Sequence, residues 1–159
     1  MSELLSQFDK DFADLKKELK FTSSLEELDS VFFFRDSVLK EGYVSTNLSK
    51  LICSRIVNIY MSWTNYLHSL VMPNPSYMIS MTEHQMFTDE ERQEIINLIN
   101  KTLALVSQNS ILNLGNDKKA ESKFVDDSLK FWNKTFQSKM IELMKKINQN
   151  WNERANSKE

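Results

Sequence analysis

The residues that could bind a metal are few and lie far apart in the sequence. The chain has two histidines, His68 and His84, and one cysteine, Cys53. They lack the short ligand spacings of zinc sites. Di-iron bundles use paired Glu-x-x-His motifs, but Asn65 and Met81 stand three positions before the two histidines. We therefore expect no metal site and no cofactor.

Residue pairs that could support catalysis are equally sparse. Glu83 and His84 form the one adjacent acid–imidazole pair, although neighbours on a loop can point in different directions. Ser37 and Lys40 match the Ser-x-x-Lys pattern, which arises often by chance in a chain rich in serine and lysine. Two glycines in the whole chain cannot form a glycine-rich phosphate loop. We expect no catalytic residue and prefer a non-enzymatic protein.

Two arginines occupy positions at which the apolar pattern predicts buried side chains. Arg35 lies within the apolar stretch 28–39, and Arg55 lies between Ile52 and Ile59 on the expected inner face of a helix. A guanidinium binds planar carboxylate or phosphate groups through paired hydrogen bonds. Either both arginines pair with acids of neighbouring helices, or they form an anion-binding pocket. The second case would make the chain a small-molecule-binding or phosphate-binding protein or enzyme.

The segment 72–87, MPNPSYMISMTEHQMF, is unusually apolar for a connection between helices and holds four of the eight methionines. Connections of this length are often functional, and methionine adapts to irregular partners. The segment either docks on the bundle and closes its end, or it binds a partner. The residues expected at such an interface, together with the last aromatic residue of the chain, are Tyr77, Met78, Met81, His84, Met86 and Trp151.

The elements that must position these residues are helices. Two glycines and two prolines in 159 residues cannot supply the turns of an all-β fold. Apolar residues recur at spacings of three and four, and a capping box is expected at Thr88–Glu91, with another at Ser23 or Ser24. The sequence predicts a single all-α domain over 1–159. It is a bundle of about five helices, at roughly 2–20, 24–41, 46–72, 88–110 and 117–153.

The last predicted helix, 117–153, is long for a protein of this size. Its apolar stripe continues from Val125 to Trp151 without a proline and predicts a fairly straight helix. At about 1.5 Å per residue it spans roughly 55 Å, whereas a spherical domain of this length has a diameter of roughly 40 Å. We therefore expect an elongated bundle. The alternative is that the helix end protrudes and Trp151 packs on another chain.

The charge pattern gives little support to nucleic-acid binding. The formal net charge is −2, too balanced for strong attraction to phosphates. The lysines that could form a basic strip on the last helix are Lys119, Lys123, Lys130 and Lys134. Glu121, Asp126 and Asp127 are interleaved with them. Weak nucleic-acid binding through helix 117–153 is therefore the second alternative function.

The remaining features favour an intracellular protein. The single Cys53 suits a reducing compartment. The N-terminal stretch MSELLSQFDKDF lacks the cationic start and apolar run of a signal peptide. The sequence also lacks a run of about 18 apolar residues, so we expect no membrane span. We expect a cytoplasmic, non-enzymatic helical interaction module, such as a regulatory or assembly subunit. Its partner is another protein or a second copy of the chain.

Overall fold

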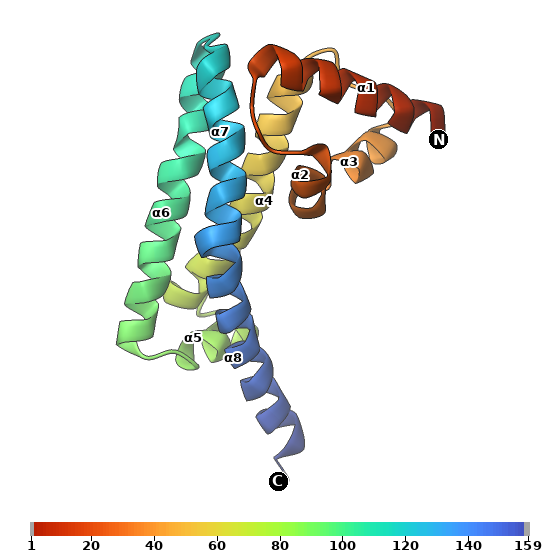
Figure 1. Ribbon diagram of the computed structural model, residues 1–159. Coiled ribbons are helices and arrows are strands. Elements are labelled where there is room, and N and C mark those ends of the chain that lie inside the picture. The colour runs from red at the N-terminus through yellow and green to blue at the C-terminus, as the bar shows by residue number, and fades with distance from the viewer. Residues whose placement is uncertain (1, 158–159) are drawn as a thin grey trace. The chain divides into compact units, whose positions relative to one another are not determined.

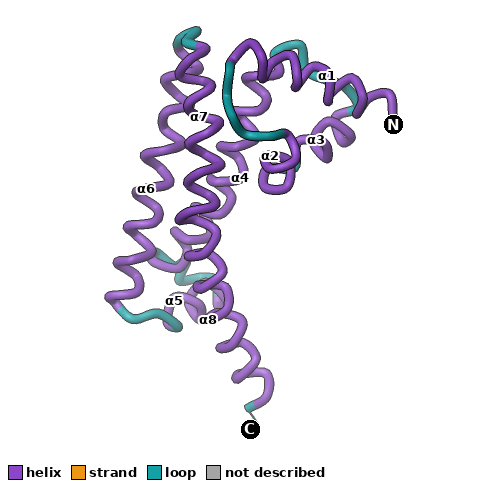
Figure 2. Tube along the Cα trace, viewed as in Figure 1, coloured by secondary structure: helices purple, strands orange, loops and turns teal. Residues whose placement is uncertain are grey.

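A computed structural model describes residues 2–157, whose regular structure is entirely helical (Figure 1, Figure 2). The elements are α1 (Ser2–Leu19), α2 (Leu25–Phe32), α3 (Phe34–Glu41), α4 (Leu48–Val71), α5 (Met78–Gln85), α6 (Asp89–Leu114), α7 (Lys118–Phe131), the π-helical turn η1 (Trp132–Phe136) and α8 (Gln137–Asn156). Because α7, η1 and α8 follow one another without a break, the described residues contain seven separate helices. The all-α class is confirmed, whereas the predicted number of about five helices is too low.

The helix predicted over 24–41 is instead two helices, which meet at Phe33. Phe33 adopts a left-handed backbone conformation, with φ 55° and ψ 50°, and its N–H donates to the Asp29 carbonyl. This geometry ends many α-helices, although glycine normally occupies the position. The Asp29 carboxylate also accepts a hydrogen bond from the backbone N–H of Arg35 at 2.9 Å, which satisfies a donor in the first turn of α3. The backbone and side chain of one aspartate therefore stabilise the break.

The segment predicted as a loop over 72–87 contains the eight-residue helix α5. Its polar residues Ser80 and Glu83 are buried, while Met78 is exposed. The segment therefore lacks the apolar stripe from which an amphipathic helix is recognised. The following helix, α6, continues to Leu114 rather than ending near 110.

The helix predicted over 117–153 contains a π-helical turn that the apolar spacing does not indicate. The N–H of Gln137 donates to the carbonyl of Trp132, five residues earlier, instead of four. The rings of Trp132 and Phe136 pack at this turn, with their centroids 5.2 Å apart. Because single π-helical turns are rare and occur often at functional sites, the surface beside Trp132 is a place to look for function.

The chain forms two compact units. Unit 1 contains the described residues of Met1–Met61 and Ala104–Lys130, and unit 2 contains those of Ser62–Leu103 and Phe131–Glu159. The elongated shape and the single-domain organisation stay predictions. None of the helices between residues 2 and 157 combines the length and the apolar character that crossing a membrane requires.

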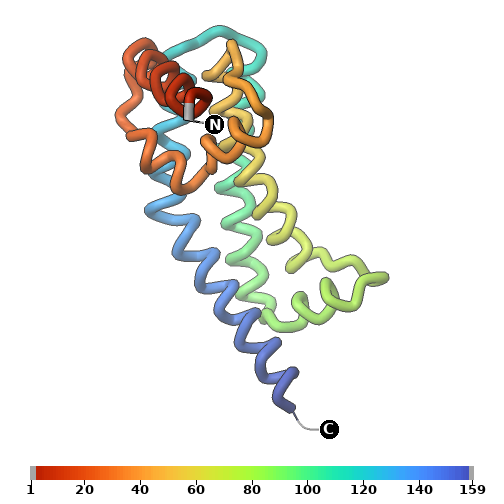
Figure 3. The backbone as a smooth tube through the Cα atoms, turned by 90° about the vertical axis from the view of Figure 1, so that its right-hand side faces the viewer, coloured from red at the N-terminus to blue at the C-terminus, as the bar shows by residue number. Residues whose placement is uncertain are grey.

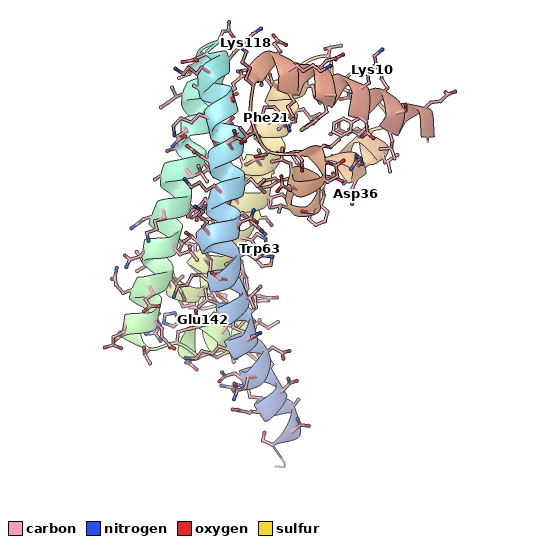
Figure 4. All side chains as sticks on the ribbon, in the orientation of Figure 1. Lys10, Phe21, Asp36, Trp63, Lys118 and Glu142 are labelled. Atoms are coloured by element: carbon pink, nitrogen blue, oxygen red, sulfur yellow. The ribbon has the colours of Figure 1, made fainter. Side chains whose placement is uncertain are left out.

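Unit 1 has an aromatic core and a polar anchor. The rings of Phe12 and Phe21 pack edge to face, with centroids 5.6 Å apart, and Phe21 lies beside α7 (Figure 4). Asp126 of α7 accepts hydrogen bonds from the backbone N–H groups and hydroxyls of Thr22 and Ser23, at 2.6 to 3.1 Å. Burial raises the pKa of Asp126, but the hydrogen bonds from Ser23 and Thr22 outweigh it and leave this pKa below its ordinary value. Asp126 thereby holds the connection between α1 and α2 against α7.

Unit 2 contains the end of α4, the whole of α5, the start of α6 and α8. The chain reverses direction after α4 and returns as α5 (Figure 3). The capping box predicted at the start of α6 is confirmed, because the N–H of Thr88 donates to Glu91 at 2.8 Å and the N–H of Glu91 donates to the Thr88 hydroxyl at 3.2 Å. Lys146 of α8 donates to the same Glu91 carboxylate at 2.6 Å. These bonds connect α8 to the start of α6.

Candidate protein interaction site

The connection between α4 and α5 is fixed by hydrogen bonds of Asn74. Its side chain accepts from the N–H of Ser76 at 3.0 Å, and its carbonyl accepts from the N–H of Tyr77 at 3.0 Å. Its own N–H donates to the hydroxyl of Ser80 at 3.1 Å. An asparagine that bonds to the backbone two residues ahead is a common turn former. This turn holds the residues on either side of it in defined positions.

The inner side of α5 is attached to the rest of unit 2 by Glu83. Glu83 is only 8% exposed. The Tyr66 hydroxyl of α4 donates to Glu83 Oε2 at 2.7 Å, and the Trp151 indole N–H of α8 donates to Glu83 Oε1 at 3.0 Å. One acidic side chain therefore links α4, α5 and α8.

Tyr66 is a dependable donor in this arrangement. Burial of its hydroxyl raises the pKa of Tyr66, and the hydrogen bond to Glu83 and the charge of that carboxylate raise it further. A tyrosine with a raised pKa keeps its proton throughout the physiological pH range. Tyr66 therefore keeps the proton that it donates to Glu83 over this range.

Glu83 and His84 do not form the acid–imidazole dyad considered from the sequence. Glu83 bonds to Tyr66 and Trp151, whereas Nδ1 of His84 lies 2.6 Å from the carbonyl oxygen of Leu70. The backbone carbonyl of His84 accepts from the guanidinium of Arg92 at 3.1 Å. The two side chains bond to different elements, and each contributes to attaching α5.

Four large apolar side chains of the same segment are exposed. Met72, Tyr77 and Met78 are 67%, 55% and 75% exposed, and Ile79 is exposed as well. We call these four residues the α5 patch. Large apolar side chains that gather on a surface mark interaction sites more often than isolated ones do. The Asn74 turn and the Glu83 bonds hold this patch on a structured segment.

A cavity of about 280 Å³ lies between the α5 patch and Glu83. Glu83 and Tyr66 line this cavity. Three of the four patch residues line it as well: Met72, Tyr77 and Ile79. Its other lining residues are polar: Asn65, His68, Ser69, Asn74 and Ser80. The patch therefore borders a small hollow that is lined in part by the carboxylate of Glu83.

The residues expected at the interface fall into three groups. Tyr77 and Met78 are exposed, Met81 and His84 are half-buried, and Met86 is buried. Trp151 is half-buried and bonds to Glu83 of its own chain. That the helix end packs on another chain stays a prediction.

Sequence reasoning missed four residues of this site. Met72 and Ile79 lie in the segment it singled out, but their exposure depends on the path of the Asn74 turn. Glu83 and Tyr66 carry no local signal, because their bond joins two helices separated by that turn.

A second apolar surface of unit 2 lies beside the π-helical turn. Trp63 of α4 lines a groove of about 480 Å³ together with Trp132 and residues of α8 (Figure 4). Those α8 residues include Met140, Ile141 and Met144. Tryptophan and methionine are enriched at protein interfaces.

Arg35 and Arg55 have partners within unit 1. The guanidinium of Arg35 lies 3.1 Å from Asp9 and 3.3 Å from Asp29, and the hydrogen bond that it donates to Asp9 is the largest cause that raises the pKa of Arg35. Arg55 donates to the carbonyl of Phe32 at 2.8 Å. Arg55, but not Arg35, lines a polar cavity of about 350 Å³. The anion-binding role expected for the two arginines stays a prediction.

Acids accompany several lysines on α7 and α8. Lys123 pairs with Asp127, and Lys118 pairs with Glu18. Lys139 lies between Glu94 and Glu142, at 3.8 and 3.6 Å. Such alternating charges are typical of a solvated helix face. Within residues 2–157, no three histidine, cysteine, aspartate or glutamate side chains gather as a metal site would require.

No protein-family model, curated protein or solved structure matches the chain.

Proposed function

We propose that the chain is a non-enzymatic helical interaction module that binds another protein through the α5 patch. The observation that carries this proposal is the exposure of Met72, Tyr77 and Met78 on a segment that hydrogen bonds hold in place. A surface that is already ordered loses less conformational entropy on binding. Methionine side chains also adapt to irregular partner surfaces. A regulatory or assembly subunit would use such a surface.

The proposal includes a reducing, intracellular site of action. Cys53 is free and buried, and burial, with a smaller contribution from the charge of Glu121, raises the pKa of its thiol to about 12. A thiol in this state is a packing residue rather than a nucleophile.

Site-specific photo-crosslinking tests the proposal. A photoreactive amino acid is placed at Met78 in the full chain, and a control places it at Leu114 of α6, which is 92% exposed and apolar. Both chains are irradiated in the cells that naturally produce the protein. We expect a discrete protein adduct at position 78 that Tyr77→Asp abolishes, and no such adduct at position 114. An adduct of two chain masses would identify the partner as a second copy.

Two outcomes would contradict the proposed function. One is the absence of an adduct at position 78. The other is a set of adducts that form at both position 78 and position 114, because shared adducts indicate nonspecific binding of exposed apolar residues.

Anion binding is a second candidate function, favoured by the cavity that Arg55 lines. Lys50, Tyr43 and Glu41 line the same cavity, so the two cationic side chains of Arg55 and Lys50 and one acid border one hollow in unit 1. Thermal shift with inorganic phosphate and with nucleotides tests this alternative. Stabilisation that Arg55→Met removes would support it, and unchanged melting temperatures would count against it.

A further inference from the structure

Glu83 is a buried carboxylate without a cationic partner among residues 2–157. No lysine, arginine or histidine of the described chain forms an ion pair with it. Its two bonds come from neutral donors, the hydroxyl of Tyr66 and the indole of Trp151. A buried charge is usually compensated by an opposite charge as well as by hydrogen bonds. Glu83 is therefore under-compensated within its own chain.

The carboxylate retains capacity for a further donor. An ionised carboxylate has about four lone-pair positions, and Tyr66 and Trp151 occupy one on each oxygen. Glu83 and Tyr66 line the cavity behind the α5 patch, whereas Trp151 does not. A donor group that enters the cavity therefore lies next to Glu83.

The cavity favours a cation and excludes an anion. Glu83 is the one charged lining residue, and the other titratable lining groups are His68, Tyr66 and Tyr77. His68 is exposed at the cavity. The two tyrosine rings also offer faces on which a cation is stabilised.

The size of the cavity limits what enters it. Pockets for drug-sized ligands begin at about 300 Å³, and this cavity is about 280 Å³. It suits one extended side chain better than a whole cofactor or nucleotide. The apolar residues Met72, Tyr77 and Ile79 line its border. They suit the methylene chain of a lysine or arginine, which packs on apolar surface while the charged end extends beyond it.

We propose that the α5 patch recognises a protein segment that presents a lysine or arginine between apolar residues, with the basic side chain paired to Glu83. The flanking apolar residues of this segment cover Met72, Tyr77 and Met78. The inference rests on the proposed function and names the chemistry of the partner. Binding then supplies the counter-charge that Glu83 lacks in the free chain.

Selection from displayed random peptides tests the inference with the full chain as bait. Peptides that still bind a Met78→Asp bait are removed, so that the remaining peptides depend on the α5 patch. We expect them to share a lysine or arginine beside apolar residues. A synthetic peptide of this kind should bind at least tenfold more weakly when norleucine replaces its basic residue, because truncating one partner of a buried charge pair is costly.

Variants of the protein complete the test. Glu83→Gln removes the charge, and we expect at least tenfold weaker binding of the basic peptide but little change for the norleucine peptide. Glu90→Gln, at an exposed glutamate of α6 in the same unit, is the matched control for net charge and should leave binding unchanged. If Glu83→Gln lowers the melting temperature enough to disturb folding, the norleucine comparison still decides, since it leaves the protein intact.

The outcomes separate the inference from the proposed function. Patch-dependent peptides without a shared basic residue would overturn the inference and leave the interaction surface supported. Equal affinity of the Glu83→Gln chain for the basic peptide would overturn it as well. The absence of any patch-dependent peptide would contradict the proposed function, and the inference with it.

Discussion

Trp151→Phe is expected to loosen α5 without unfolding the protein. The substitution removes the indole N–H that donates to Glu83 at 3.0 Å and keeps an aromatic ring on α8. Hydrogen bonds to charged groups contribute about 1.5–3 kcal/mol, and Trp151 is half-buried, so we expect about 1–2 kcal/mol. Because about 1.4 kcal/mol corresponds to a factor of ten, the open state of α5 should become roughly tenfold more populated.

Amide hydrogen exchange measures this population directly. The N–H groups of α5 should exchange roughly tenfold faster in Trp151→Phe. Trp63→Phe is the matched control, since Trp63 is a partly exposed tryptophan of the same unit and the substitution causes the same loss of ring size. Equal exchange of α5 in the two variants would refute the reasoning, because the effect would then come from ring size and not from the bond.

Tyr66→Phe extends the test to the second donor. Tyr66 and Trp151 bond to the two oxygens of one carboxylate, so their contributions should not be independent. In the double variant, Glu83 has lost both of the donors that stabilise it, and we expect a loss of stability larger than the sum of the single losses. Strict additivity would show that the two bonds act separately.

Three further predictions concern unit 1. Asp126→Ala should lower the free energy of unfolding in urea by about 1–3 kcal/mol, because Thr22 and Ser23 lose their acceptor. Since the pKa of Asp126 is lowered on folding, its contribution is complete above the unfolded pKa of about 4 and is lost as the pH falls through the lower folded pKa. Asp126→Asn should flatten that acid dependence, and an unchanged pH profile would contradict this assignment. Lys20→Gly should raise the melting temperature and add about 1 kcal/mol, since exposed Lys20 has a left-handed φ of 61°; a lower melting temperature would count against it. Arg35→Met should cost about 1 kcal/mol, less in 1 M salt, because its ion pairs are partly exposed; a loss independent of salt would argue for a packing role instead.

The parts of the fold that the sequence predicts well depend on neighbouring residues. The capping box of Thr88 and Glu91 is an interaction over three positions, and the box of Ser24 and Glu27 at the start of α2 is another. The long apolar stripes likewise identify α4, α6 and the α7–α8 helix. Interactions of this kind form wherever the residues and the helix are present, so their pattern in the sequence is sufficient.

The parts that the sequence does not predict depend on distant residues. The break at Phe33 requires the Asp29 carboxylate to cap the following helix, and nothing in the apolar pattern indicates that role. Glu83 reads as one polar residue of a methionine-rich segment, yet its partner Trp151 is 68 positions away. The candidate site could therefore be narrowed from the sequence to the segment 72–87, but its hollow and its buried acid could not.

One binding measurement tests the central claim most directly. Met78→Asp and Leu114→Asp place the same charge on two exposed apolar residues of different units, and both chains are titrated against the partner identified by crosslinking at position 78. Burying a methionine side chain contributes about 1.5–3 kcal/mol, so Met78→Asp should weaken binding by about 10-fold to 100-fold. Leu114→Asp should leave the affinity unchanged. Equal affinity of both variants, or a loss confined to Leu114→Asp, would contradict the assignment of the α5 patch as the binding surface.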